Sequence, residues 1–102
     1  MSQTGCRGWI YFIRAGKSPR VKVGYTRKSV QSRLSTLQVG TPDSLIVEHS
    51  FQVTEPDILE SLVHKDLARF RVRGEWFELD EDTLLAYIEA FEEVRLPEFV
   101  SD

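Results

Sequence analysis

The spacing of the apolar residues changes repeatedly along this sequence, and this alternation restricts the chain to a mixed α+β fold. Residues Gly8–Arg14 are rich in aromatic and β-branched side chains, which favour strands. Residues Ala15–Arg20 contain Gly, Ser and Pro, which turn a chain, and Val21–Tyr25 has the pattern of a returning strand. We therefore predict a β-hairpin with a long, basic loop at the start of the fold.

A helix and a third strand follow this hairpin in the predicted order. Val30, Leu34 and Leu37 recur at helical spacing, after a candidate N-cap at Thr26 or Ser29. Residues 39–44 read as a loop, and residues 45–53 return to a pattern typical of a strand. The first half of the chain is therefore predicted as strand, strand, helix, strand.

The clearest helix begins at Thr54, which we expect to be its N-cap. Pro56 falls in the first turn, where its missing N–H costs nothing, and Asp57 lies near the positive end of the helix. Gly74 is placed to end this helix or the turn after it. The expected buried stripe consists of Leu59, Leu62, Val63, Leu67 and Phe70.

The last third of the chain predicts a short strand and a final helix. Residues 75–79 alternate like a strand, and Asp80 opens an acidic, amphipathic helix within residues 80–102, with Pro97 ending regular structure. We expect the inward residues to be Leu84, Leu85, Ile88 and Phe91. A chain of 102 residues holds one modest core, so residues 1–102 are predicted as a single α+β domain of order β-β-α-β-α-(short β)-α.

Positive and negative charges are segregated along the chain. Residues 1–40 contain no Asp or Glu and eight Lys and Arg, whereas residues 41–102 hold the other five Lys and Arg and all sixteen acids, a balance of −11. This distribution predicts a cationic face that binds a polyanion. The alternative is that the two halves neutralise each other across one fold.

Several classes of protein are excluded by what the sequence lacks. No apolar run approaches the ~20 residues that a membrane-spanning helix needs, and the N-terminus lacks the pattern of a secretion signal. Cys6 is the only cysteine, so it can form no internal disulfide and no thiolate-rich zinc site. We therefore expect a cytoplasmic protein without a membrane partner or an organic cofactor.

Four short motifs occur in order along the predicted elements. They read Gly8-Trp9-Ile10-Tyr11, Lys22-Val23-Gly24-Tyr25-Thr26, Arg33-Leu34, and Glu60 to His64 followed by Arg73-Gly74-Glu75-Trp76-Phe77. Over roughly residues 8–79 this arrangement resembles the GIY-YIG nuclease superfamily, in particular its small phage and meiotically-up-regulated-gene branch. The resemblance implies a three-stranded antiparallel sheet flanked by helices, and hydrolysis of DNA phosphodiesters with one divalent metal ion.

The resemblance also implies roles for single residues. Tyr11 would act on the attacking water as general base or positioner, Arg33 would stabilise the phosphate, and Glu60 would hold Mg²⁺ or Mn²⁺. Lys22 stands where the superfamily has the second motif's tyrosine, and Tyr25 follows three residues later. Both Lys22 and Tyr25 are therefore catalytic candidates.

The chemistry of these residue types suits that reaction. Mg²⁺ prefers carboxylate oxygen and keeps several waters, so one glutamate is a sufficient protein ligand. Lys22 could depress the pKa of Tyr11 or contact the phosphate directly. His64 lies four residues after Glu60, on the same helix face, where it could protonate the leaving oxygen or hydrogen-bond to that carboxylate. Glu75 is either an acid beside the metal or a solvent-facing strand residue.

Three functions follow from these observations. The first is a metal-dependent DNA endonuclease, which as a homodimer would cut both strands. The second is a DNA-binding module that keeps the fold without the catalysis, and the third is a protein-interaction domain. The first two predict salt-sensitive binding of DNA by the early basic residues Arg14, Lys17, Arg20, Arg27 and Lys28.

Overall fold

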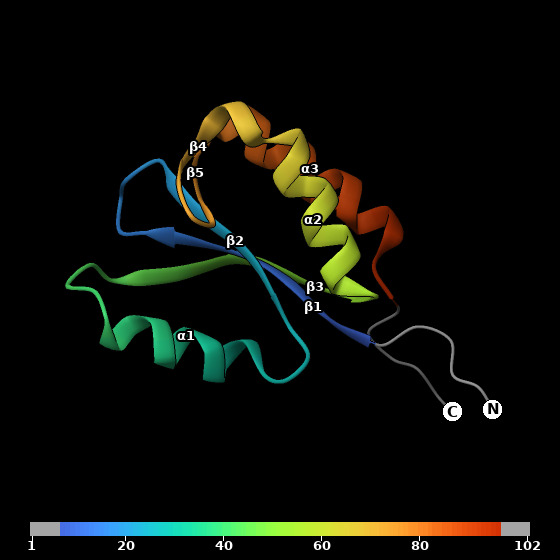
Figure 1. Cartoon of the computed structure of the whole chain (residues 1–102), viewed down its shortest axis with the longest axis horizontal. Helices are drawn as coiled ribbons and strands as arrows, with labels where there is room; N and C mark the ends of the chain where they lie inside the picture. Colours follow the sequence, from blue (N-terminus) through green and yellow to red (C-terminus); the bar gives the residue numbers. More distant parts are fainter. Residues whose placement is uncertain (1–6, 97–102) are drawn as a thin grey trace.

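The computed structural model describes residues 7–96 as one antiparallel sheet with helices on both of its faces (Figure 1). The elements run in the order β1 (Arg7–Ala15), β2 (Arg20–Thr26), α1 (Val30–Val39), β3 (Leu45–Thr54), α2 (Pro56–Asp66), the 3₁₀ helix η1 (Ala68–Phe70), β4 (Arg71–Arg73), β5 (Trp76–Glu78) and α3 (Glu81–Val94). The α+β class and the predicted order of the larger elements are confirmed. Cys6 and Pro97 lie outside the described residues.

The sheet has five strands in the order β3-β1-β2-β5-β4, so the expectation of three strands was too few. The strands β1, β2 and β3 form the long central part, and the short β4–β5 hairpin extends it along β2, from the pair Arg20–Glu78 to the pair Lys22–Trp76. All three residues of β4 are exposed. Because the strand buries no side chain, its sequence has no apolar pattern from which this edge strand could be predicted.

The two faces of the sheet carry cores of different size. Figure 1 shows α2 and α3 on one side of the strands and α1 on the other. Under α2 and α3, aromatic rings stack in a large apolar core, with Phe91 5.5 Å from Phe51 and 6.0 Å from Phe12. Under α1, the buried residues are Tyr11, Ile13 and Leu45, and the three residues predicted at helical spacing, Val30, Leu34 and Leu37, pack on them.

The helix starts were predicted in part. Ser29 caps α1 and Asp80 caps α3, each through a side-chain oxygen that accepts a backbone N–H. Thr54, however, does not cap α2, because the N-cap position is Glu55, in the left-handed conformation at φ 51° and without a side-chain hydrogen bond. Pro56 begins the helix, and it is buried.

The predicted buried stripes also needed two corrections. Leu62 is 56% exposed and Leu85 is 50% exposed, whereas their neighbours Val63 and Leu84 are buried. Helix α2 ends at Asp66, four residues before the predicted stripe does, and Phe70 packs on the core from η1. Among the described residues, no helix is long and apolar enough to cross a membrane.

Candidate functional site

The centre of the candidate site is the contact between Tyr11 on β1 and Gly24 on β2. The two residues pair directly in the sheet, and the Tyr11 ring is fully buried. A Cβ atom on Gly24 would lie 2.5 Å from the Tyr11 hydroxyl, so only glycine leaves room for the phenol there. Arg33, reaching over from α1, donates from Nε to the Tyr11 hydroxyl oxygen at 3.4 Å. The first three motifs therefore meet at one hydroxyl group.

Burial raises the pKa of Tyr11 above its ordinary value of 10.0, and Arg33 opposes that rise through its hydrogen bond and charge. The nearby carboxylates of Glu75 and Glu60 raise the pKa further. The pKa of Tyr11 is thus raised rather than depressed, and the Lys22 ammonium, which we had considered as the group that lowers it, pairs with Glu75 at 3.2 Å. At neutral pH the hydroxyl keeps its proton, accepts from Arg33 and has its own hydrogen to donate.

Glu60 brings α2 to the same place. Its side chain is only 12% exposed, and its Oε2 atom is buried without a hydrogen-bond partner. Burial raises the pKa of Glu60, Glu75 raises it further, and His64 and Lys22 act against the rise. A buried carboxylate oxygen without a partner is costly, and a bound cation would satisfy it.

His64 and Glu75 fix the surroundings of Glu60. The Nε2 atom of His64 lies 2.7 Å from the carbonyl oxygen of Val23, which can only accept, so Nε2 carries the proton. The same nitrogen is 4.0 Å from Glu60 Oε2, which is too far for the hydrogen bond that we considered from the sequence. Glu75 forms an ion pair with Lys22 at 3.2 Å, and the Lys22 Nζ also lies 5.6 Å from the centre of the Trp76 ring.

Six of the predicted residues are thus brought together, and we call them the Gly24 cluster: Tyr11, Lys22, Arg33, Glu60, His64 and Glu75. The donor set suits a hard divalent cation, because it offers carboxylate oxygens. No group of three or more His, Cys, Asp or Glu side chains within residues 7–96 has the spacing of a metal cage.

Tyr25 does not join the cluster. Residues 24 and 25 point to opposite faces of β2, so Tyr25 packs against the core under α2 and α3, with Arg27 5.4 Å from its ring. Its assignment as a catalytic residue is therefore not supported by its position.

The predicted DNA-binding residues divide into two groups. Arg14 forms ion pairs with Glu48 at 2.8 Å and with Glu81 at 3.7 Å, and Arg27 pairs with Asp57 at 3.1 Å. Together with the Lys22–Glu75 pair, these bridges join the basic half of the sequence to the acidic half. Neutralisation across the fold, the alternative reading of the charge pattern, therefore accounts for these cations. The exposed remainder of the predicted set consists of Lys17, Arg20 and Lys28.

Sequence reasoning missed two features of the site. The carbonyl of Val23 anchors His64, and no side-chain pattern can indicate a backbone acceptor. Trp76 also lies beside the cationic end of Lys22, a contact that we had not predicted. Its pairing with Lys22 across β2 and β5 depends on a strand register that the sequence does not encode locally.

Comparison with known proteins identifies a different family from the one that the motifs suggested. The family model that matches this chain is that of the T5orf172 domain, over residues 8–92, and this match overturns the assignment to the GIY-YIG superfamily. No curated protein and no solved structure matches the chain. The matched segment spans every helix and strand from β1 to most of α3. The chain therefore belongs to the T5orf172 domain family.

Proposed function

We propose that this chain is a metal-dependent DNA endonuclease that hydrolyses phosphodiester bonds at the Gly24 cluster. The observation that carries the proposal is the buried Oε2 atom of Glu60, which has no hydrogen-bond partner within residues 7–96 and lies near a lysine and a protonated tyrosine that an arginine contacts. Phosphodiester hydrolysis needs this combination: a cation site, positive charge for the phosphate, and a polar group for the water.

Glu60 would hold the divalent cation, with Glu75 as the nearest second carboxylate. When bound, Mg²⁺ or Mn²⁺ supplies positive charge to the phosphate oxygens and acidity to water. The donor chemistry fits, because Mg²⁺ accepts one or two protein carboxylates and completes its shell with water and substrate oxygen.

Arg33 and Lys22 would bind the phosphate. Arg33 uses its Nε for Tyr11, which leaves both terminal amino groups of its guanidinium for the two-pronged contact that phosphate favours. Arg33 is exposed, so substrate can reach it without a rearrangement of the core. Lys22 would exchange its pairing with Glu75 for phosphate as substrate enters.

Tyr11 would position water or phosphate through its hydroxyl hydrogen, because its raised pKa argues against a phenolate base. His64 is the better candidate for proton transfer. Since its Nε2–H is held by the Val23 carbonyl, the Nδ1 atom of the neutral ring is left as the acceptor.

The test is nicking of supercoiled plasmid with Mg²⁺ or Mn²⁺ by wild type, Glu60→Ala and Glu89→Ala. Glu89 is an exposed carboxylate on α3, away from the cluster, so it is the matched control. We expect Glu60→Ala to lose at least about a hundredfold in rate and Glu89→Ala to match the wild type. Equal cutting by all three proteins would contradict the proposal.

A second candidate, a DNA-binding module without catalysis, is favoured by one observation. The Lys22–Glu75 ion pair already neutralises the carboxylate next to Glu60, so a single free carboxylate is left for a cation. Salt-sensitive DNA binding without nicking, under either metal, would support this candidate over hydrolysis.

A further inference from the structure

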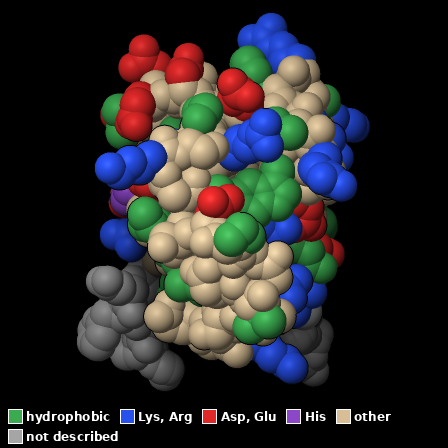
Figure 2. Space-filling view, turned by 90° about the vertical axis from the view of Figure 1, so that its left-hand side faces the viewer, with side chains coloured by type: hydrophobic (Ala, Val, Ile, Leu, Met, Phe, Trp, Pro, Cys, Tyr) green, Lys and Arg blue, Asp and Glu red, His purple; other side chains and the backbone are tan. Residues whose placement is uncertain are grey.

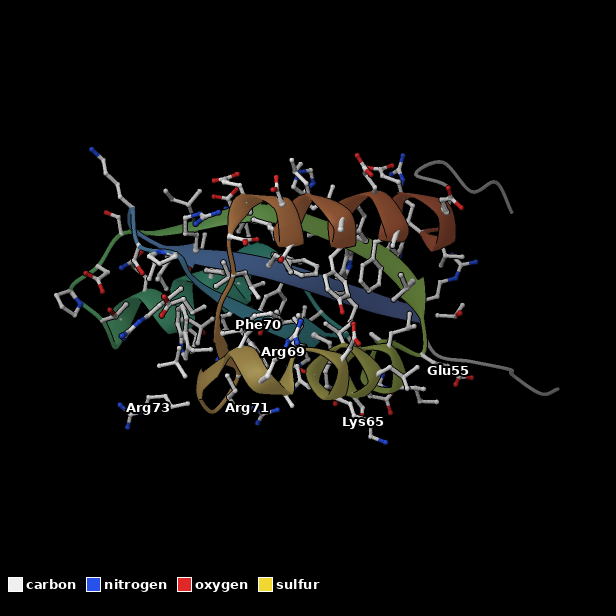
Figure 3. All side chains as sticks on the ribbon, turned by 90° about the horizontal axis from the view of Figure 1, so that it is seen from above. Glu55, Lys65, Arg69, Phe70, Arg71 and Arg73 are labelled. Atoms are coloured by element: carbon white, nitrogen blue, oxygen red, sulfur yellow. The ribbon has the colours of Figure 1, made fainter. Side chains whose placement is uncertain are left out.

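Four cations that were not among the predicted contacts lie close together between α2 and β5. We call them the basic row: Lys65, Arg69, Arg71 and Arg73. They are four of the five Lys and Arg in the acidic half of the sequence, and all four are exposed. Figure 3 shows Lys65, Arg71 and Arg73 projecting from the same edge of the molecule, away from α3, with Arg69 on the side nearer α3.

The basic row differs from three of the early cations, Arg14, Lys22 and Arg27, in its electrostatic partners. Arg14, Lys22 and Arg27 each form an ion pair with a carboxylate, whereas no member of the row does so with any described residue. Two members are instead held against aromatic rings: Arg69 lies 4.8 Å from the centre of Phe70, and Arg71 lies 5.1 Å from that of Phe77. Such stacking orients a guanidinium without neutralising it.

The acids nearest to this row lie toward β5 and α3, where Glu78 and Asp80 line the same pocket as Arg69 and Arg71 without forming an ion pair with either. Asp66, the one acid between Lys65 and Arg73, accepts a hydrogen bond from the Tyr87 hydroxyl on α3 and is thereby held toward that helix. Most other acids belong to α3 and the segment before it. Figure 2 shows many red side chains at the upper left and several blue ones along the right-hand edge, with a few red side chains between them.

The chain leads from the Gly24 cluster into the basic row and back again. Glu60 and His64 precede Lys65 on α2, and Glu75 follows Arg73 by two residues, at the turn into β5. Both ends of the row are therefore anchored in the cluster. A polyanion bound at the cluster would meet these free cations next.

We propose that the basic row binds the sugar-phosphate backbone of DNA beyond the bond at the Gly24 cluster. This inference takes its ligand from the proposed function. Three of the four cations are arginines, whose planar fork suits phosphate, and their separation from carboxylates means that no ion pair must break on binding. The early cations Arg14 and Arg27 would each have to lose such a partner.

The experiment compares two double variants of the full chain, Lys65→Gln/Arg73→Gln and Arg7→Gln/Arg95→Gln. Each removes two exposed cations, and Arg7 and Arg95 belong neither to the basic row nor to the cations predicted to contact DNA. Exposed substitutions of this kind change stability little, so the two variants are matched in charge and in expected stability. Binding is measured by fluorescence anisotropy with a labelled DNA duplex in EDTA, over a series of salt concentrations. Metal is absent, so the result does not depend on cutting.

We expect the row variant to bind about tenfold more weakly at low salt, and its slope of log K against log salt to fall by roughly 1.8, the value for two lost phosphate contacts. The Arg7/Arg95 variant should stay within about twofold of the wild type. Equal weakening of DNA binding in both variants, or a larger loss in the control variant, would overturn the role of the row. Wild-type binding to an acidic peptide or to anionic vesicles, without binding to DNA, would overturn it as well. Nicking by wild type with unchanged binding by the row variant would refute the row alone. A row effect without nicking would refute hydrolysis alone.

Discussion

Helix α2 and strand β2 each serve two regions of this molecule, the apolar core under α2 and α3 and the polar Gly24 cluster. On α2, Val63 and Leu67 are buried in the core, whereas Glu60 and His64 belong to the cluster. On β2, Val21 and Val23 face the core, and Lys22 and Gly24 face the cluster. On both elements, the residues that stabilise the fold therefore lie only one residue or one helical turn away from residues of the candidate site.

This comparison teaches that the two regions should respond differently to substitution. The core contains interlocking apolar groups, so its loss appears as free energy of unfolding. The cluster contains a carboxylate whose raised pKa reflects an unfavourable buried charge at neutral pH, together with the exposed Arg33, so its loss should appear mainly as a loss of activity. Each prediction below can break this separation or define it more sharply.

The largest effect is expected for Phe91→Ala in the core. Phe91 is 5% exposed and its ring packs on Phe51 and Phe12, so truncation should lower the free energy of unfolding by about 3–5 kcal/mol. Urea unfolding measures this loss. The nicking rate per folded molecule should remain that of the wild type, and a large fall in that rate would show that the core and the cluster are not separable.

Gly24→Ala is expected to have the next largest effect, and Gly8→Ala is its control. An added Cβ at Gly24 would meet the Tyr11 hydroxyl at 2.5 Å, and one at Gly8 would meet Pro56 at 2.6 Å. Both should cost about 1–3 kcal/mol of stability through overpacking. Only Gly24→Ala should also slow nicking, by about a hundredfold, because it displaces the phenol. Similar nicking rates in the two variants would remove Tyr11 from the site.

The parts of the fold that follow apolar spacing could be predicted from the sequence. The β1–β2 hairpin, α1, β3 and α3 have regular patterns and side-chain caps at Ser29 and Asp80. The edge strand β4 could not be found this way, because it buries no side chain. The start of α2 was wrong by one residue, since the left-handed turn at Glu55 is set by the path from β3 rather than by a capping side chain.

The residues of the candidate site could be predicted from the sequence, but their burial and their hydrogen-bond partners could not. Lys22 and Tyr25 are three positions apart on β2, so the two-residue alternation of a strand already places them on opposite faces. We nevertheless predicted Tyr25 as a catalytic candidate, because of the motif resemblance. Tyr11 is buried, and Oε2 of Glu60 lacks a hydrogen-bond partner among the described residues, because α1 and α2 pack against the sheet. No local sequence pattern encodes that packing.

Tyr11→Phe should have a smaller effect on the rate and a diagnostic pH dependence. Loss of the hydroxyl should slow nicking by roughly tenfold to a hundredfold, the scale of one transition-state donor. Because the pKa of Tyr11 is raised, the hydroxyl is protonated throughout the range below about pH 9, and the ratio of wild-type to variant rates should be constant there. A ratio that grows with pH would mean that a phenolate base acts instead.

The same raised pKa predicts the stability of this variant at alkaline pH. A group whose pKa is higher in the folded state contributes stability that is complete below its unfolded pKa of ~10 and is lost as the pH rises through the folded value. The alkaline decline in the wild-type unfolding midpoint should therefore be shallower in Tyr11→Phe.

The smallest effect is expected for Glu60→Gln, measured as the thermal stability of the metal-free chain. Burial and Glu75 raise the pKa of Glu60 above 4.5, so the folded state favours its neutral form. The stabilising contribution of that protonation is complete below the unfolded pKa and is lost as the pH rises through the folded value. At pH 7 a neutral glutamine should therefore stabilise the fold by on the order of 1 kcal/mol, the scale of relieving a buried unpaired group, and the gain should vanish toward about pH 4.

Added Mg²⁺ should raise the unfolding temperature of the wild type more than that of Glu60→Gln, because only the carboxylate offers a full charge to the cation. A variant that is less stable than the wild type at pH 7, or an equal response to Mg²⁺, would mean that the Glu60 carboxylate is a structural group of the fold rather than a charge held ready for a ligand.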